Sequence, residues 1–180
     1  MAAVCVFCAS SRTLDERWLD LARDVGVRLG QHGHRVVSGG GRVGMMGRLV
    51  EGARSGGGFT FGVIPQSLVD LEVADEQADE LVVTDGMAAR KTVMLERSDV
   101  FLVLPGGLGT LDELFEVWTT ATLGQHAKPI VLLDVDGFYA GLMSWLEGLV
   151  GLGFVRAEAL SMVHVARNMD EALDVVQRFG

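Results

Sequence analysis

Hydrophobic positions along the chain form short apolar runs that alternate with longer segments of helical periodicity. The runs of strand length are Ala3–Ala9, Arg35–Ser38, Thr60–Ile64, Leu81–Val83, Val100–Leu104, Ile130–Leu133 and the weaker Met162–Val165. The helical segments are Leu14–His32, Gly44–Arg54, Ala88–Arg97, Thr110–Leu123, Phe138–Leu149 and Met169–Phe179. Strands that are apolar throughout are buried on both faces, as in a parallel sheet covered by helices on each side. The pattern predicts one doubly wound α/β domain with a mostly parallel sheet over residues 1–180.

The stretch between the third and fourth apolar runs departs from this alternation. Residues Gln66–Glu80 are acidic and less periodic than their neighbours, which predicts a loop that contains a short helix. No repeat, low-complexity segment or linker interrupts the sequence, so we expect a single domain.

Polar and glycine-rich residues gather where the predicted strands end. The segments that follow the strands are Ser10-Ser11-Arg12, Gly39-Gly40-Gly41, Pro65, Asp85 and Pro105-Gly106-Gly107. Ligands of open α/β sheets bind outside the carboxyl ends of the strands. The sequence therefore predicts one shared cleft along this edge of the sheet, with Met87 beside it.

The most informative segment is Pro105–Glu113, which directly follows the apolar run Val100–Leu104. It predicts a buried strand, a glycine-rich turn and a helix that opens at Thr110. Glycine lets the backbone approach a ligand closely, and the free N–H groups of a helix start bind anions such as phosphate. Asp112, Glu113 and Glu116 follow within reach of a bound sugar, so the segment indicates a nucleotide site with a chemical group beside it.

The same residues also match a helix-capping motif. In a capping box of the form T-x-x-E, Thr110 would cap the helix and Glu113 would reach back to the Thr110 N–H. Asp112 and Glu116 would then only favour the positive end of the helix dipole. The sequence leaves catalytic and capping roles for Glu113 open.

A second glycine loop, Gly39-Gly40-Gly41-Arg42-Val43-Gly44, also follows a strand and opens a helix. It matches G-x-G-x-x-G, but the next strand ends in Val63-Ile64-Pro65 without the acid that a dinucleotide site requires. NAD binding is therefore disfavoured. Contact with phosphate and a tight structural turn are both compatible with the loop, and the neighbouring glycine loop favours phosphate.

The charge of the chain narrows the classes of ligand. The formal net charge is −9 at pH 7, whereas a general nucleic-acid binder normally carries a basic face. A nucleic-acid polymer is therefore not expected as a partner, and any phosphate site must be local. The longest uncharged stretch, Ser55–Val69, is too short and too interrupted by glycine and proline to span a membrane, and no basic targeting region precedes the first apolar run.

The two cysteines, Cys5 and Cys8, both lie in the first predicted strand. Their opposite parity directs the side chains to opposite faces of a sheet, which favours buried thiols over a redox pair. No metal-ligand spacing joins the cysteines or the four histidines, so we expect no metal, and the reduced cytoplasm is the expected compartment.

Arg90 and Lys91 begin a predicted helix just after the sheet edge at Asp85. Arginine can bind phosphate or a base edge with paired hydrogen bonds, although a solvated helix face explains the same residues. Lys91 and Lys128 are the only lysines in the chain, so Lys91 is not part of a general lysine coat.

Taken together, these motifs resemble those of the LOG ("lonely guy") family of cytokinin riboside 5′-monophosphate phosphoribohydrolases, which also carries an older label of lysine decarboxylase. The family pattern P-G-G-x-G-T-x-x-E matches Pro105–Glu113, and Gly39–Gly47 matches the family's second glycine loop. Further matches are Val6–Ser11, Gly62–Pro65, Leu123–Pro129 and Asp136–Tyr139, so the resemblance covers nearly the whole chain.

The resemblance implies a Rossmann-like fold, a homodimer and hydrolysis of the N-glycosidic bond of an N6-substituted AMP to free base and ribose 5-phosphate. It places the catalytic pair at Arg90 and Glu113, without a metal or organic cofactor. It adds ligand contacts at Glu72, Lys91, Gly107, Leu108, Gly109, Thr110, Leu111, Asp112 and Thr119. The sheet edge and glycine loops themselves predict contacts at Ser10, Gly40, Gly41, Gly44, Met87, Gly106 and Glu116.

One departure from the family pattern concerns the substrate. The family often has M-H-x-R-K where this chain has Met87-Ala88-Ala89-Arg90-Lys91, so a histidine near the base or dimer edge is absent. Two other functions compete with hydrolysis. A nucleotide sensor would bind without turnover, and a pyridoxal-phosphate decarboxylase would need Lys91 or Lys128 as its Schiff-base lysine.

The segment Thr110–Leu123 carries many apolar positions for one helix. They are Leu111, Leu114, Phe115, Val117 and Trp118. We expect part of this surface to form a dimer interface, and burial in the core of one chain explains the same pattern equally well.

Overall fold

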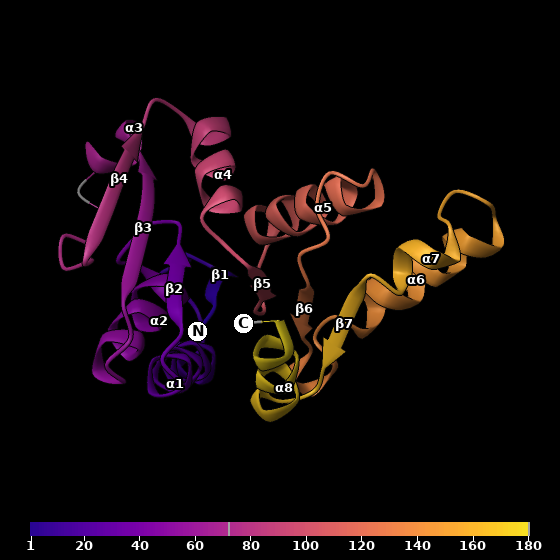
Figure 1. Ribbon diagram of the computed structural model, residues 1–180, viewed down its shortest axis with the longest axis horizontal. Helices are drawn as coiled ribbons and strands as arrows, with labels where there is room; N and C mark the ends of the chain where they lie inside the picture. The colour runs from indigo at the N-terminus through magenta and orange to yellow at the C-terminus, as the bar shows by residue number, and fades with distance from the viewer. Residues whose placement is uncertain (72, 180) are drawn as a thin grey trace.

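The computed structural model describes residues 1–71 and 73–179, which form one three-layer α/β domain. Seven strands form an all-parallel sheet in the order β4-β3-β2-β1-β5-β6-β7. The strands are β1 (Ala3–Phe7), β2 (Arg35–Ser38), β3 (Thr60–Pro65), β4 (Glu80–Thr84), β5 (Val100–Val103), β6 (Ile130–Leu133) and β7 (Val163–Ala166). The predicted doubly wound fold is confirmed (Figure 1).

Helices cover both faces of this sheet (Figure 1). On one face lie α1 (Glu16–Gln31), α2 (Gly44–Ser55) and α8 (Met169–Phe179). On the other lie α4 (Met87–Glu96), α5 (Leu108–Thr122) and α6 (Ala140–Gly151). The short helices are α3 (Gln66–Val69), α7 (Ala157–Leu160) and the 3₁₀ turn η1 (Val135–Gly137). The acidic stretch thus holds a short helix as predicted, whereas α7 lies outside the predicted elements.

Each central strand sends alternate side chains into the two apolar layers. Val4 and Val6 pack with α1 and α2, whereas Cys5 and Phe7 pack with the layer under α4 and α5. Cys8 lies beyond the end of β1 in the first layer, so the two cysteines lie on opposite faces, as their spacing predicts. Both are free and buried, and burial raises the pKa of each thiol well above its usual value.

The order of the strands fixes where a ligand can enter. The chain builds outward from β1 to β4 on one side and from β5 to β7 on the other, so the winding direction changes between β1 and β5. At such a switch point the segments leaving neighbouring strands diverge and leave a crevice above their carboxyl ends. In this protein the segments leaving β1 and β5 contain Ser10 and Pro105-Gly106-Gly107.

The predicted start of α5 was two residues too late. The helix begins at Leu108 with Gly107 as its N-cap, and no side chain caps it. Thr110 lies inside the first turn and is buried, because its side chain packs closely against the backbone of Gly106. Thr110 therefore cannot form the N-cap of a capping box, and the capping interpretation of Glu113 is wrong.

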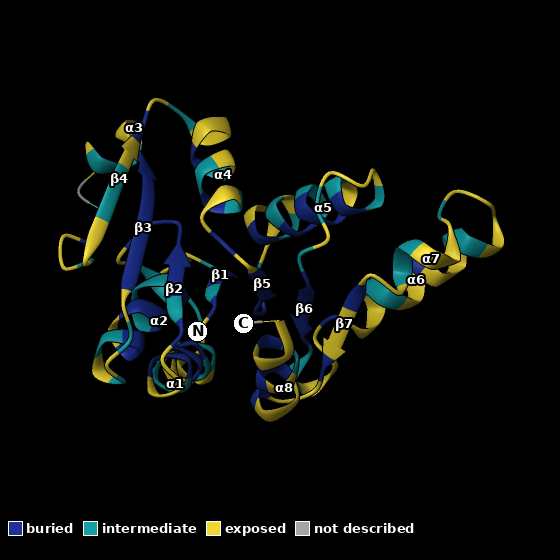
Figure 2. Ribbon diagram, viewed as in Figure 1, coloured by how far each residue is buried: buried dark blue, intermediate teal, exposed yellow. Residues whose placement is uncertain are grey.

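The α6–α7 arm, residues 140–160, projects from the edge of the domain (Figures 1 and 2). Most of its side chains are exposed or half-buried, and Leu146 anchors it in the core. Among the described residues, no helix is long and apolar enough to cross a membrane.

Candidate active site

A cavity of about 570 Å³ opens above the carboxyl ends of β1, β2 and β5. Its wall combines polar groups with apolar side chains. The described residues that line it are Cys8, Ala9, Ser10, Ser11, Arg12, Gly39, Gly41, Val43, Met46, Leu68, Leu71, Val73, Met87, Arg90, Gly107, Gly109, Thr110, Asp112 and Glu113. The shared cleft predicted at this edge of the sheet is present.

Arg90 projects from the first turns of α4 into the floor of the cleft and is 5% exposed. Its Nε donates to the carbonyl oxygen of Val63 on β3 at 3.1 Å. Its Nη2 donates to the carbonyl oxygen of Gly39 at 3.2 Å, beyond the end of β2. A carbonyl on β3 and one just beyond β2 therefore hold the guanidinium plane. At the other edge of this plane, Nη1 lies 3.7 Å from the sulfur of Met87 and also faces Glu113 on α5.

Glu113 meets that edge from α5. Its Oε1 lies 3.9 Å from Nη1 of Arg90, and only 12% of the Glu113 side chain is exposed. Burial raises the pKa of this carboxyl to about 7, while the positive charge of Arg90 acts in the opposite direction. A carboxyl group with a pKa near neutrality, in a cleft and beside a fixed cation, is typical of catalytic acids and bases.

Gly39 is a glycine because Arg90 occupies the space of its side chain. A Cβ atom at position 39 would lie 1.6 Å from Nη2 of Arg90, far inside van der Waals contact. The first glycine of the second loop thus leaves room for the guanidinium of Arg90. Gly40 and Gly44 in the same loop have φ angles of +70° and +60°, a region that strongly favours glycine.

The amino end of α5 forms the opposite wall of the cleft. The Leu111 N–H donates to the Gly107 carbonyl oxygen at 3.0 Å. The amides of Leu108, Gly109 and Thr110 precede this bond, so no earlier turn of α5 supplies them with a carbonyl partner. Such a set of amides, at the positive end of a helix dipole, favours an anion.

Lys91 contacts two of the three acids at the start of α5, Asp112 and Glu116. Its Nζ lies 3.1 Å from Asp112 Oδ2 and also contacts the carboxylate of Glu116. These two acids raise the pKa of Lys91, chiefly through its hydrogen bonds with them. Lys91 thus binds two of the three acids, and Glu113 is the carboxylate that Arg90 faces in the cleft.

The structure brings together about half of the predicted contact residues. Those that line the cleft are Ser10, Gly41, Met87, Arg90, Gly107, Gly109, Thr110, Asp112 and Glu113. Gly40, Gly44 and Gly106 shape the adjoining loops, whereas Lys91, Leu108, Leu111, Glu116 and Thr119 do not line the cleft within a single copy. Glu72 lies outside the described residues.

Sequence reasoning missed the apolar wall of the cleft. Leu68, Leu71 and Val73 come from the acidic stretch, for which we predicted a loop with a short helix but no part in the cleft. This stretch is fastened to the second glycine loop, since Arg42 N–H donates to the Val73 carbonyl and Asp75 N–H to the Gly40 carbonyl, both at 2.8 Å. The apolar positions Leu68, Val69, Leu71 and Val73 within an otherwise acidic segment were the available signal.

The described part of the chain contains no group of three or more histidine, cysteine, aspartate and glutamate side chains able to hold a metal ion.

Comparison with known proteins adds independent information. The family model described as "possible lysine decarboxylase" matches residues 46–176. A Mycobacterium tuberculosis protein named cytokinin riboside 5′-monophosphate phosphoribohydrolase is 50% identical over 170 residues, covering 94% of this chain and 90% of that protein. The Arabidopsis thaliana protein of the same name, LOG2, is 37% identical over 176 residues, and the match covers 98% of this chain and 83% of that protein. The solved molybdenum cofactor carrier protein of Chlamydomonas reinhardtii superposes with a TM-score of 0.73 at 25% identity, covering 98% and 96% of the two chains.

Proposed function

The chain belongs to the LOG family of cytokinin riboside 5′-monophosphate phosphoribohydrolases, and from this premise we propose how its cleft hydrolyses nucleotides. The substrates are N6-modified adenosine 5′-monophosphates. Hydrolysis of the N-glycosidic bond releases the free base and ribose 5-phosphate. The observation that carries the proposal is the approach of Arg90 to Glu113 across the cleft, 3.9 Å apart and both shielded from water.

The chemistry of bond cleavage calls for these two groups. As the bond between C1′ and the base nitrogen lengthens, positive charge builds on the ribose and negative charge on the departing base. The ionised Glu113 carboxylate stabilises the ribose cation and orients the water that attacks C1′. Arg90 favours the ionised form of Glu113 against the effect of burial and offers its Nη1 to the reacting nucleotide, but it does not donate a proton.

The two ends of the nucleotide are assigned to the two walls of the cleft. The 5′-phosphate fits the amides at the start of α5, where Gly107, Gly109 and Thr110 line the cavity. The N6 substituent fits the opposite apolar wall of Leu68, Leu71, Val73, Met46 and Met87. This orientation places the ribose between the walls, within reach of Glu113.

The positions of the lysines argue against decarboxylation. Lys91 is engaged by two carboxylates, and Lys128 contacts the carbonyl oxygen of Leu95. Neither is among the described residues that line the cleft, where a Schiff-base lysine would be needed. A nucleotide sensor is also disfavoured, because the capping interpretation that would give Glu113 only a structural role is wrong.

Direct assay of the purified protein tests the function. We expect isopentenyladenosine monophosphate to yield isopentenyladenine and ribose 5-phosphate in equal amounts, followed by chromatography. Parallel assays with AMP and dAMP measure the preference for the N6 group and for the 2′-hydroxyl. Binding of AMP without turnover of any of the three nucleotides would support the sensor instead.

Substitution of Gly39 by alanine is expected to lower kcat/KM at least tenfold, since the new methyl group must displace the Arg90 guanidinium from its two carbonyl partners. The matched control is Gly141→Ala, because a Cβ atom at that position on α6 meets no other atom within 4 Å. Steady-state kinetics and thermal unfolding should be measured for both variants. Equal activity of the two variants would contradict the role given to Gly39.

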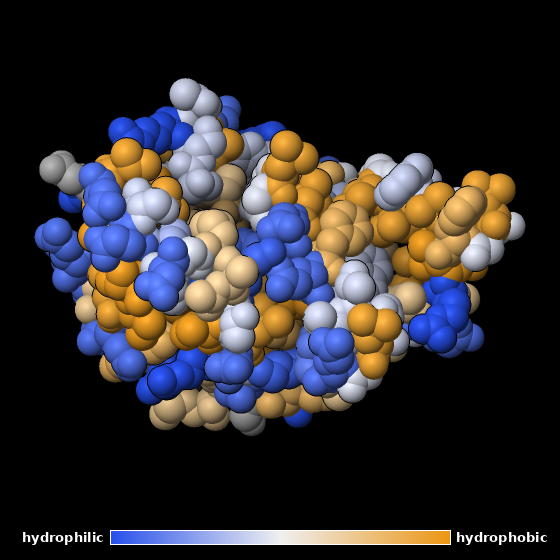
Figure 3. Space-filling view, turned by 90° about the horizontal axis from the view of Figure 1, so that it is seen from above, coloured by the Kyte–Doolittle hydropathy of each residue, from blue (hydrophilic) through white to orange (hydrophobic). Residues whose placement is uncertain are grey.

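We also propose a homodimer that buries the exposed apolar surface of the α6–α7 arm. Trp145, Leu152 and Phe154 are 60%, 72% and 80% exposed, and hydrophobic side chains gather at this end of the molecule (Figure 3). Beside them, a groove of about 300 Å³ between α5 and the arm is lined by Phe115 and Trp118. A second copy of the chain is the expected occupant, because apolar patches of this kind mark protein interfaces.

Substitution of Phe154 by aspartate is expected to weaken this dimer, since a charge would enter the apolar contact. Light scattering after size exclusion should give twice the chain mass of 19.3 kDa for the wild type and a smaller average mass for the variant. An unchanged melting temperature of the diluted variant would show that the fold is intact. A wild-type protein that is monomeric at all concentrations would exclude the dimer.

The cellular compartment of the protein is also proposed. We place the protein in the cytoplasm, since its two thiols are free and buried in separate apolar layers.

A further inference from the structure

The turn that follows β6 holds a tyrosine against the glycine loop of the cleft. Between β6 and α6 the chain passes through Asp136 and Gly137, whose φ angles are +55° and +70°. Asp134 Oδ1 accepts a hydrogen bond from the Tyr139 N–H at 2.6 Å, and the Asp134 N–H donates to the carbonyl of Ala166 on β7 at 2.8 Å. The tight turn and these two bonds fix the backbone of Tyr139 relative to the sheet.

The hydroxyl of Tyr139 reaches the segment that leaves β5. The residue is 2% exposed, and its Oη donates to the Leu104 carbonyl oxygen at 2.7 Å. Burial raises the pKa of the phenol, while a hydrogen bond from the backbone of Gly106 acts to lower it. The hydrogen bond to Leu104 thus fixes the main chain directly before Pro105.

The hydrogen bond to Leu104 lies just before the amides at the start of α5, which we assign to the 5′-phosphate. Gly107 is the N-cap of α5, and the amides that would hold an anion follow it directly. The loop has little other means of support from its own side chains, because glycines 106 and 107 have none. A buried hydrogen bond that restrains Leu104, just ahead of this loop, therefore limits the directions in which these amides point.

We propose that Tyr139 is a positioning residue for the substrate's 5′-phosphate, acting through the loop from Pro105 to Gly107. Tyr139 is not among the described residues that line the cleft, so it acts without touching the nucleotide. The proposal rests on the proposed function, since it presumes that the phosphate is bound at the start of α5. It assigns a role to the Asp136–Tyr139 segment, which the chemistry at Arg90 and Glu113 does not use.

The test compares Tyr139→Phe with Ser98→Ala. The first variant removes only the hydroxyl that bonds to Leu104. The second removes a similar buried hydrogen bond, from Ser98 Oγ to the Met94 carbonyl at 2.6 Å, near the amino end of the same strand β5. Both variants should lose comparable thermal stability, so any difference in their kinetics reports on the loop.

We expect Tyr139→Phe to raise KM for isopentenyladenosine monophosphate about tenfold, with kcat changed less than threefold, since one hydrogen bond of ordinary strength is lost. Competitive inhibition by ribose 5-phosphate should weaken by the same factor, whereas inhibition by adenine, which lacks the phosphate, should not change. Ser98→Ala should retain the wild-type KM within twofold.

An unchanged KM in Tyr139→Phe, or an equal increase in Ser98→Ala, would overturn the positioning role while leaving the proposed function intact. Weaker inhibition by adenine as well as by ribose 5-phosphate would overturn it too, because a general loosening of the cleft would then be the cause. Failure of the wild-type protein to hydrolyse the nucleotide would refute both the function and this inference.

Discussion

Glu113→Gln is expected to lower kcat for isopentenyladenosine monophosphate by about 10²–10³-fold while KM changes little. Glutamine has nearly the shape of glutamate, so the cleft and the helix should be retained. It lacks the negative charge that stabilises the ribose cation in the transition state, and that charge acts at full strength only where water is excluded, as it is around Glu113. Single-turnover kinetics would separate loss of chemistry from slow product release.

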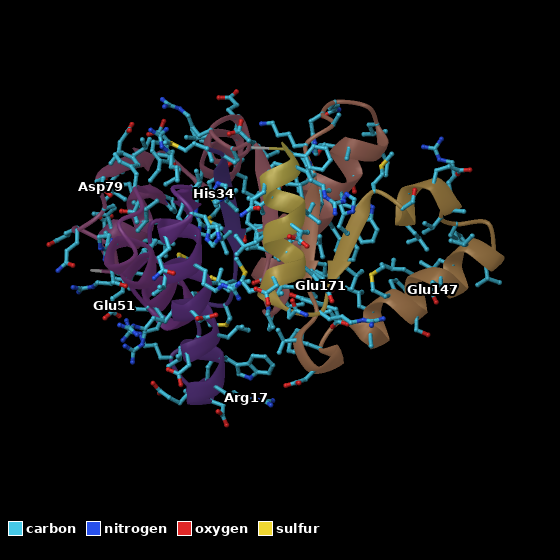
Figure 4. All side chains as sticks on the ribbon, turned by 60° about the horizontal axis from the view of Figure 1, so that its bottom comes forward. Arg17, His34, Glu51, Asp79, Glu147 and Glu171 are labelled. Atoms are coloured by element: carbon cyan, nitrogen blue, oxygen red, sulfur yellow. The ribbon has the colours of Figure 1, made fainter. Side chains whose placement is uncertain are left out.

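A control variant should remove a glutamate charge away from the cleft. Glu147 lies exposed on the projecting arm (Figure 4) and is not among the described residues that line the cleft. Glu147→Gln should therefore have kcat and KM within twofold of the wild type. Full activity in Glu113→Gln would remove the carboxylate from the mechanism.

The pH dependence of the wild type provides a second measurement of the same group. Because burial raises the pKa of Glu113 to about 7 and the ionised form is the active one, kcat/KM should fall about tenfold per pH unit below that value. Above it the profile should be level until another group titrates. A profile that is flat between about pH 5.5 and 8 would conflict with a catalytic carboxylate of this pKa.

The same raised pKa means that ionised Glu113 lowers the stability of the folded protein. The folded protein binds the carboxyl proton more tightly than the unfolded chain, in which the pKa of this glutamate is near 4.5. Stability is therefore lost as pH rises from about 4.5 to about 7, and the loss is complete above that range. Glu113→Gln should accordingly be more stable than the wild type at pH 8, by on the order of 2 kcal/mol or several degrees in Tm, and equally stable near pH 4. A less stable variant at pH 8 would contradict this sign.

Arg90→Lys is expected to lower kcat/KM by about 10²-fold or more, although the side chain remains positive. An ammonium group cannot hold the Val63 and Gly39 carbonyls and also present an edge to Glu113, because it lacks the planar fork of three nitrogens. The fixed position of the charge would be lost. Steady-state kinetics at pH 8, where Glu113 is ionised in the wild type, measure this effect directly.

Arg90→Met serves as the comparison that removes the charge altogether. It should be less active than Arg90→Lys and should also be less stable, since two buried carbonyls lose their donors at about 1–3 kcal/mol each. Without the cation beside it, Glu113 should titrate at a higher pH than in the wild type. Near-wild-type activity in Arg90→Lys would show that position and fork geometry do not matter.

Much of the fold was predictable because the strands carry a strong local signal. In β1 and β5 nearly every side chain is apolar and buried, and this predicted a parallel sheet covered on both faces. Element ends were less accurate, as at α5, where Gly107 ends the loop and the buried Thr110 belongs to the first turn. The apolar wall formed by Leu68 and Leu71 was missed, because a few apolar residues among acids do not show which part of the molecule the segment packs against.

The sequence by itself determined the class of fold, the edge of the sheet where the cleft opens, and the family, since all three depend on local patterns and motifs. Only the tertiary structure decided that Glu113 faces Arg90 and does not cap its own helix, and that Lys91 binds Asp112 and Glu116. The reason is physical. Periodicity shows which side of an element is buried, whereas the charge state and chemical role of a side chain depend on the groups that packing places against it.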